Sequence, residues 1–179
     1  MADIITPPSK ASIEAARPRS AAAPGTEEHE RGALELMELL FFAYRDFISD
    51  PDQILEQYGF GRAHHRVLHF VLRNPGIRVA ELLDILKITK QSLGRVLKQL
   101  IEEGFIYQRE GASDRRQRLL YVTEKGRALA LSLAAPQITR IRAALEQSGE
   151  GTEERLRSAL LNLVNGTERE QVRRWIGSR

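Results

Sequence analysis

The chain contains no cysteine among its 179 residues. This absence excludes disulfide bonds, zinc sites with thiolate ligands, cysteine nucleophiles and cysteine redox sensors. Long apolar runs are also missing: none approaches the roughly 18 residues that span a bilayer, and residues 1–24 lack the apolar stretch of a signal peptide. We therefore expect a soluble, cytoplasmic protein that has no membrane partner.

Motifs for enzymatic chemistry are missing too. The sequence has no Gly-rich phosphate loop, no serine nucleophile motif and no evident pair of catalytic carboxylates. His64, His65 and His69 suggest a metal site, because the last two stand four residues apart on one helical face. Further ligands are not evident, since His29 lies near the N-terminal tail. We expect no enzyme, no metal site and no cofactor, and interpret these histidines as ordinary surface or partly buried residues.

The positive charge of the chain is concentrated in one segment. The whole chain has a net charge of +3, while residues 87–118 hold eight basic and four acidic residues, a net charge of +4. A basic segment in a balanced protein is typical of a surface that binds a polyanion. A solvated charged face is the commoner origin of such a run, so the pattern within the segment has to distinguish the two.

The N-terminal part of the chain changes character near residue 27. Residues 1–26 are rich in Ala, Pro and Ser, which predicts a flexible tail. From Leu34 to Ile48, apolar residues recur at helical spacing, and we expect Asp50-Pro51 to end or interrupt this helix. The helix is apolar on most sides, which favours packing on a second subunit, with a central core helix of a monomer as the alternative.

The middle of the chain has the pattern of a helix-turn-helix. Apolar spacing predicts a helix over residues 62–73, ended by an Asn-Pro-Gly sequence, and a short helix over residues 79–86. Another helix is predicted to start after Thr89, whose hydroxyl suits the N-cap position, and to end at Gly104. Two short helices joined by a turn of a few residues form a helix-turn-helix.

The helix that follows Thr89 has two different faces. The apolar face consists of Leu93, Val96, Leu97, Leu100 and Ile101. The polar face consists of Gln91, Arg95, Lys98, Gln99 and Glu102. One face would pack in the core, and the other would be free to contact a ligand.

A hairpin and more helices complete the predicted elements. Residues 105–109 and 118–122 are rich in aromatic and β-branched types, which predicts two strands around a polar loop. Thr123 is expected to cap a helix over residues 124–147, which Pro136 should kink or interrupt. Thr152 is expected to cap a last helical region, and an Asn-Gly-Thr sequence is expected to break it near residue 166.

This arrangement resembles the MarR family of bacterial transcriptional regulators over about residues 30–165. The most specific likeness is the exit from the helix at Leu100 to Gly104, the Asp-Arg-Arg sequence at residues 114–116 and Val-Thr-Glu-Lys-Gly at residues 122–126. Residues 61–68 add weaker support. The resemblance implies a mainly α fold with a small β-hairpin wing, in which a winged helix-turn-helix is flanked by terminal dimerisation helices.

With this resemblance, the chain divides into four expected parts. These parts are a flexible tail (1–26), an N-terminal dimerisation helix with its linker (27–60), a winged helix-turn-helix lobe that binds DNA (61–123) and C-terminal dimerisation helices (124–179).

The resemblance also implies the residues that contact DNA. A helix fits the major groove, where its first turns face the base edges and its N-terminal N–H groups face phosphates. The candidates on this helix are Thr89, Lys90, Gln91, Ser92, Arg95 and Lys98. Gln91 could pair with adenine, and Arg95 with guanine or a phosphate. A purely solvated helix face is the alternative.

The tip of the wing is the second expected contact. By resemblance, Arg115 would enter the minor groove, and Arg116 would contact the DNA backbone or brace the wing. Asp114 would hold a neighbouring arginine such as Arg118 and so shape the loop. A surface ion pair of little consequence is the alternative. The sequence departs from the family at Gly94, where Ser or Thr is common, so no polar contact is assigned there.

We therefore expect a sequence-specific transcriptional regulator, a repressor that binds double-stranded DNA as a homodimer on a pseudo-palindromic operator. The resemblance further implies a small-molecule effector, bound between the dimerisation helices and the DNA-binding lobe. An architectural or protein-interaction winged-helix module, without operator-specific regulation, is the alternative function.

Overall fold

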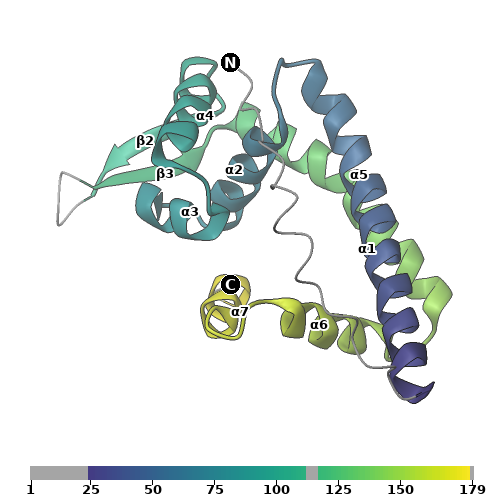
Figure 1. Cartoon of the computed structure of the whole chain (residues 1–179). Coiled ribbons are helices and arrows are strands. Elements are labelled where there is room, and N and C mark those ends of the chain that lie inside the picture. Colours follow the sequence, from purple (N-terminus) through teal and green to yellow (C-terminus); the bar gives the residue numbers. More distant parts are fainter. Residues whose placement is uncertain (1–23, 112–116, 178–179) are drawn as a thin grey trace, which may run out of the picture. The chain divides into compact units, whose positions relative to one another are not determined.

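The computed structural model describes residues 24–111 and 117–177 (Figure 1). The chain divides into two units, residues 1–44 and 45–179, so that the long first helix crosses from one unit to the other. The elements follow in the order α1 (Pro24–Glu56), α2 (Arg62–Arg73), β1 (Ile77–Arg78), α3 (Val79–Leu86), α4 (Lys90–Glu102), β2 (Ile106–Glu110), β3 (Arg118–Val122), α5 (Glu124–Ser148), α6 (Thr152–Leu163) and α7 (Arg169–Gly177).

The second unit contains a lobe with one apolar core. Three helices, α2, α3 and α4, lie beside the hairpin of β2 and β3 (Figure 1). Their apolar faces are buried together with the inner face of the sheet. The apolar side chains of this core with at most 1% exposure are Leu55, Val67, Leu68, Val71, Leu82, Leu93, Leu100, Phe105, Ile106, Leu120 and Leu133. Burial of a Val, Leu, Ile or Phe side chain stabilises a fold by about 1.5 to 3 kcal/mol, so this cluster can hold the lobe together.

The sheet of the lobe contains the predicted hairpin and one further strand. β2 and β3 pair antiparallel with Tyr107 opposite Tyr121, and β2 begins one residue later than predicted. The additional strand, β1, pairs with the other edge of β3 and places Ile77 opposite Leu120. Because β1 has only two residues, alternation of side chains could not reveal it from the sequence.

Helix α1 does not end at the Asp50-Pro51 sequence, which corrects the prediction. It continues to Glu56 with Pro51 inside it. Proline lacks the N–H that would bond to the carbonyl four residues earlier, which here is Phe47. The amide of Gln137 from α5 donates to this carbonyl at 3.1 Å, so a distant side chain replaces the missing bond.

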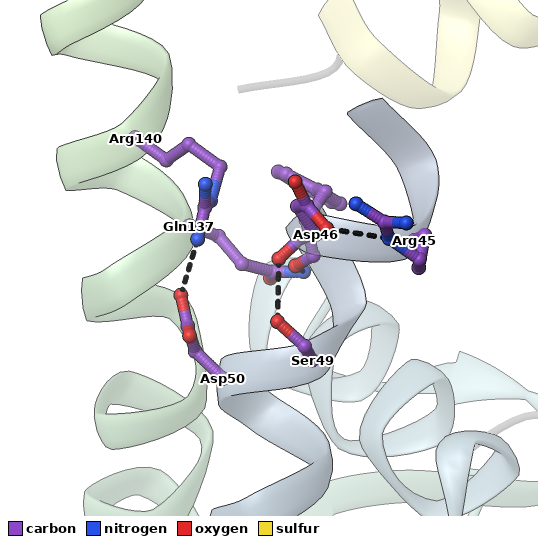
Figure 2. A network of polar contacts seen from close by, with 7 residues as sticks. Arg45, Asp46, Ser49, Asp50, Gln137 and Arg140 are labelled. Carbon is purple, nitrogen blue, oxygen red and sulfur yellow. Dashed lines mark hydrogen bonds and ion pairs between the residues drawn. The ribbon is translucent and has the colours of Figure 1, made fainter. Parts of the chain in front are cut away.

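An ion pair also joins the second half of α1 to α5. The guanidinium of Arg140 lies 3.0 Å from the carboxylate of Asp50, as Figure 2 shows. Pro51 itself is fully buried. The second half of α1 is therefore held in place by side chains of α5, and the break expected at the proline does not occur.

The long helix after the wing follows the prediction at its start. The hydroxyl of Thr123 accepts a hydrogen bond from the Gly126 N–H at 3.0 Å, which confirms it as the N-cap of α5. The helix continues through Pro136 without interruption to Ser148.

The C-terminal helices differ from the prediction in one respect. The break near residue 166 is confirmed, since α6 ends at Leu163 and α7 begins at Arg169. The N-cap of α6, however, is Gly151 in a left-handed conformation, and not Thr152. The hydroxyl of Thr152 instead donates to the carbonyl of Ser148, so it is used to join α6 to the end of α5.

The part of α1 in the first unit exposes its large apolar side chains. Within residues 28–44 of α1, eight large apolar side chains are between 44% and 69% exposed. They are Leu34, Leu36, Met37, Leu39, Leu40, Phe41, Phe42 and Tyr44. The predicted tail, residues 1–26, lies outside the described residues except for residues 24–26, which begin α1.

Candidate nucleic-acid interface

The start of α4 has the geometry of a capped helix N-terminus. Thr89 has extended backbone angles, and its hydroxyl accepts a hydrogen bond from the Ser92 N–H at 3.1 Å, which confirms it as the N-cap. The same hydroxyl donates to the Ser92 hydroxyl at 2.9 Å. The helix dipole places partial positive charge at this end, where an anion is favoured.

The two predicted faces of α4 are confirmed by burial. Leu93, Val96, Leu97 and Leu100 are the buried residues of the helix. Lys90, Gln91, Arg95 and Lys98 are exposed, and Ser92 is half-buried. The helix therefore presents amide and cationic side chains to solvent along its first turns, while its other side is fixed in the core.

The cations of this face differ in their partners. Lys98 lies 3.8 Å from Glu102 one turn further along, a long and exposed pair that contributes little to stability. Lys90 and Arg95 form no ion pair within the part of the chain that the structure describes. Neither charge therefore has to give up an ion pair within the described residues in order to bind a polyanion.

The wing carries a cation that sequence reasoning missed. The rings of Tyr107 and Tyr121 are stacked with centroids 5.4 Å apart. The guanidinium of Arg109 lies 5.2 Å from the first ring centroid and 5.4 Å from the second. Such cation–π contacts restrain an arginine while its charge stays exposed. The two-residue spacing of Tyr107 and Arg109 on one strand was the available signal.

The tip of the wing lies outside the described residues, and with it Asp114, Arg115 and Arg116. At the base of the tip, Arg118 forms an ion pair with Glu110 at 2.8 Å across the hairpin. The two residues are directly opposite in the strand register, so the pair closes the end of the hairpin next to the tip.

The C-terminal end of α4 is fastened to the start of α5. The Thr123 hydroxyl donates to the Gly104 carbonyl at 2.6 Å, and the Lys125 ammonium donates to the Glu103 carbonyl at 2.9 Å. Cations and donors at a helix C-terminus satisfy its free carbonyls and oppose its negative partial charge. Residues 122–126, singled out in the sequence, thus hold the candidate recognition helix in position.

Gly126 shows why this contact requires a glycine. A Cβ atom built on Gly126 would lie 1.9 Å from the Phe105 carbonyl oxygen, which is far inside contact distance. Gly94, in contrast, meets nothing within 4 Å, so no neighbour in the described chain requires its small size.

An ion pair also reaches the turn between α3 and α4. Lys87, in a left-handed conformation at the end of α3, lies 2.9 Å from the carboxylate of Glu168 just before α7. The pKa of Lys87 is raised because its ammonium donates to Glu168 and is attracted by the negative charge. Lys87 therefore already has an anionic partner from the C-terminal segment.

The histidines do not come together as a metal site. Within the described residues, no group of three or more His, Cys, Asp and Glu side chains could hold a metal ion. Burial lowers the pKa of His65, as expected for an imidazole in a partly apolar position. In the same part of the chain, no helix is long and apolar enough to cross a membrane.

Comparisons with known proteins agree with the winged helix-turn-helix geometry. A model of the MarR family matches residues 58–117. The HTH-type transcriptional regulator PetP of Rhodobacter capsulatus is 48% identical over 124 residues, which cover 69% of this chain and 73% of PetP.

Solved structures share the fold at lower sequence identity. A SlyA-like transcription regulator from Listeria monocytogenes has a TM-score of 0.61 at 22% sequence identity. The match spans 78% of this chain and 90% of that regulator's chain. Streptococcus pneumoniae FabT, solved in complex with DNA, has a TM-score of 0.64 at 16% sequence identity. The match spans 73% of this chain and 94% of the FabT chain.

Proposed function

The chain belongs to the MarR family of transcriptional regulators, and from this premise we propose that it represses transcription as a homodimer bound to a pseudo-palindromic operator in double-stranded DNA. Members of this family are DNA-binding regulators and not enzymes.

The observation that carries the proposal is the division of α4 into a buried apolar face and an exposed amide and cationic face. Helix α4 is 13 residues long, about 20 Å at 1.5 Å per residue, and this length suits insertion into the major groove. Gln91 and Arg95 lie within the first two turns, from which base edges are read. FabT, which shares the fold, was solved in complex with DNA.

The roles within the interface follow from chemistry. Gln91 would pair with adenine and Arg95 with guanine, while Lys90 and Lys98 would contact phosphates. Thr89 and Ser92 already bond to each other, which suits them to hold the helix start, while the first N–H groups of the helix, at Lys90 and Gln91, would face a phosphate. At the wing, Arg115 would enter the minor groove, and Arg116 would contact the backbone beside it. Asp114 would shape that loop.

The proposal of a homodimer is supported by the exposed apolar side chains of α1. Eight large apolar side chains that are 44% to 69% exposed over residues 28–44 exceed what a monomer in water usually exposes in one place. The other terminal helices add exposed apolar residues, namely Leu131, Ile138, Ile141, Leu156, Leu160, Leu163 and Ile176. A second copy of the chain would cover them and place two α4 helices about one turn of DNA apart, roughly 34 Å.

An effector would act by changing the spacing of the two α4 helices. A hollow of about 540 Å³ between the end of α1 and α5 is large enough for a small molecule, and it is lined by Asp50, Pro136, Thr139, Arg140, Ala143, Ala144 and Gln147. Because Arg140 pairs with Asp50 here, a ligand that separates this pair would loosen the contact between α1 and α5.

Selection of bound fragments from the host genome tests the proposed function most broadly. We expect enrichment of short pseudo-palindromes near promoters, bound at least about a thousandfold more tightly than unrelated DNA. The affinity of both DNA classes is then measured over a range of salt concentrations. An architectural module would enrich no motif and would lose its affinity for both classes with the same salt slope.

A further inference from the structure

The C-terminal segment of the chain reaches the turn that leads into α4. The carboxylate of Glu168, just before α7, lies 2.9 Å from the ammonium of Lys87, which ends α3 two residues before the N-cap of α4. Trp175 of α7 is half-buried and lines a hollow of about 260 Å³ together with residues 74–77 and Glu81. The C-terminal segment therefore lies beside the lobe near both ends of α3.

Glu168 is held in place by the corner between α6 and α7. Its N–H donates to the Asn165 carbonyl at 2.9 Å. The guanidinium of Arg169 donates to two carbonyls at the end of α6, those of Asn162 at 2.6 Å and Val164 at 2.9 Å. Donors of this kind satisfy the free carbonyls at a helix C-terminus. The carboxylate therefore extends toward the end of α3 from a backbone that these bonds fix.

The backbone of Lys87 is fixed by the lobe and does not depend on Glu168. Its N–H donates to the Leu83 carbonyl at 2.9 Å, and the guanidinium of Arg66 on α2 donates to the Leu86 carbonyl at 3.1 Å. Lys87 has a φ of 51°, in the left-handed region that glycine adopts without a steric penalty. A lysine at such a position points to a use for its side chain.

Glu168 is the anion that acts most strongly on the Lys87 ammonium. The pKa of Lys87 is raised by the hydrogen bond to Glu168 and by attraction to its charge, while burial lowers it. The attraction of Asp84 on α3 is the smallest of these contributions. The lysine side chain is 62% exposed and the glutamate side chain 40%. Because an exposed ion pair contributes little to stability, another anion could replace Glu168 at small cost.

We propose that Glu168 competes with DNA for Lys87: its carboxylate occupies an ammonium that would otherwise contact a phosphate at the start of α4, and it thereby weakens DNA binding. The competition rests on the proposed function, in which the first N–H groups of α4 face a phosphate. A lysine contacts phosphates as a flexible point charge. The C-terminal segment then sets the affinity for all DNA sequences alike, because phosphate contacts carry no sequence information.

The binding test uses the full chain, a duplex recovered by the genomic selection and an unrelated duplex. Fluorescence anisotropy measures both affinities over a range of salt concentrations. Glu168→Gln should tighten binding to both duplexes by about threefold for each bound chain at about 0.1 M salt, since the pair that it removes is weak. Because one more phosphate is contacted, the slope of log K against log salt should become more negative by about 0.9 for each chain.

Glu170→Gln is the matched control, because it removes the same charge from the same segment. Glu170 lies 3.7 Å from Arg173 and 3.6 Å from Arg174. Its replacement should change the affinity by less than about 1.5-fold, since separated surface charges are screened by salt. In a Lys87→Gln background, Glu168→Gln should likewise leave the affinity and the salt slope almost unchanged. Equal gains from both glutamate variants, a gain that persists without Lys87, or no gain from Glu168→Gln would overturn the competition.

Spectra of ¹⁵N-labelled lysine ammonium groups test the ion pair without DNA. The Lys87 signal is assigned as the one that Lys87→Gln removes. Glu168→Gln should shift this signal in the free protein, and Glu170→Gln should leave it in place. An unshifted signal in Glu168→Gln would refute the pair, and the competition with it.

The two tests together separate this competition from the proposed function. If the Lys87 signal shifts as expected and no duplex binds to any variant, the proposed function fails, and the competition with it, while the ion pair stands. If the selected duplex binds and Glu168→Gln brings no gain, the proposed function stands and the competition fails.

Discussion

The winged lobe and the first described segment of α1 contain similar kinds of apolar residues, but the lobe buries them and the α1 segment exposes them. In the lobe, leucines such as Leu68, Leu82 and Leu100 are fully buried. In residues 28–44 of α1, Leu36 is 69% exposed and Phe41 is 63% exposed. The apolar side chains of the lobe are thus buried within one chain, whereas those of the α1 segment stay exposed.

This difference agrees with the proposal that the two regions have different partners. The lobe can fix the position of α4 by itself, because the apolar core and the Thr123 bond to the end of α4 belong to the same unit. It needs no other protein to present a face to DNA. The α1 segment, in contrast, leaves its large apolar side chains exposed within the described residues, and we propose that another copy of the chain covers them.

The largest effect is expected from a charge placed in the exposed apolar segment of α1. Phe41→Glu should raise the dissociation constant of the dimer more than about a hundredfold, because the interface would have to bury a charge in each copy. Sedimentation equilibrium measures this change. Circular dichroism should show that the lobe stays folded, and Glu38→Gln on the same helix serves as the control with little expected effect. A dimer unchanged by Phe41→Glu would remove this segment from the interface.

The next largest effect concerns the lobe alone. Gly126→Ala should lower the free energy of unfolding by about 3 kcal/mol, since a methyl group has no room beside the Phe105 carbonyl. Urea unfolding of the lobe measures it. A loss below about 0.5 kcal/mol would mean that the α4–α5 junction adjusts easily and does not fix the recognition helix.

A smaller effect is expected where the lobe meets DNA. Arg95→Ala should weaken binding to the selected operator by about tenfold, or about 1.4 kcal/mol, with much less effect on unrelated DNA. Competition between labelled operator and unrelated duplexes provides the measurement. Arg142→Ala, which removes an exposed arginine of α5, is the matched control for net charge. Equal losses for both DNA classes would reassign Arg95 to a phosphate contact.

The smallest effect is a gain in stability. Gly94→Ala should stabilise the free protein by about 1 kcal/mol, because the added methyl meets only open space and alanine favours the helix. The same variant tests the reason for the glycine. If binding to operator weakens while stability rises, the DNA backbone approaches α4 closely at this position; if both improve, the glycine is only a weak point in the helix.

Local chemistry made much of the lobe predictable from the sequence. Thr89 and Thr123 cap helices as expected, because a hydroxyl at an N-cap needs only its own helix as a partner. The buried face of α4 follows likewise from the spacing of residues such as Leu93 and Leu100. Features set within about four residues along the chain could therefore be inferred without a structure.

Features that depend on distant partners could not be inferred. Pro51 remains inside α1 because Gln137, 90 residues from Phe47, supplies the donor that the proline removes from that carbonyl. Thr152 has an available N-cap hydroxyl, yet it bonds to the end of α5 instead. At the candidate interface, the restraint of Arg109 by two stacked tyrosines depends on strand register, which the sequence does not reveal.

The stoichiometry of the DNA complex tests the central proposal most directly. The mass of the complex between the full chain and a selected duplex can be measured by sedimentation velocity or light scattering, alongside a duplex that retains only one half of the pseudo-palindrome. We predict two chains on the complete duplex and a loss of at least about tenfold in affinity on the half site. One chain per complete duplex, bound equally well to the half site, would contradict a regulator in which the lobe reads DNA and the exposed face of α1 joins two copies.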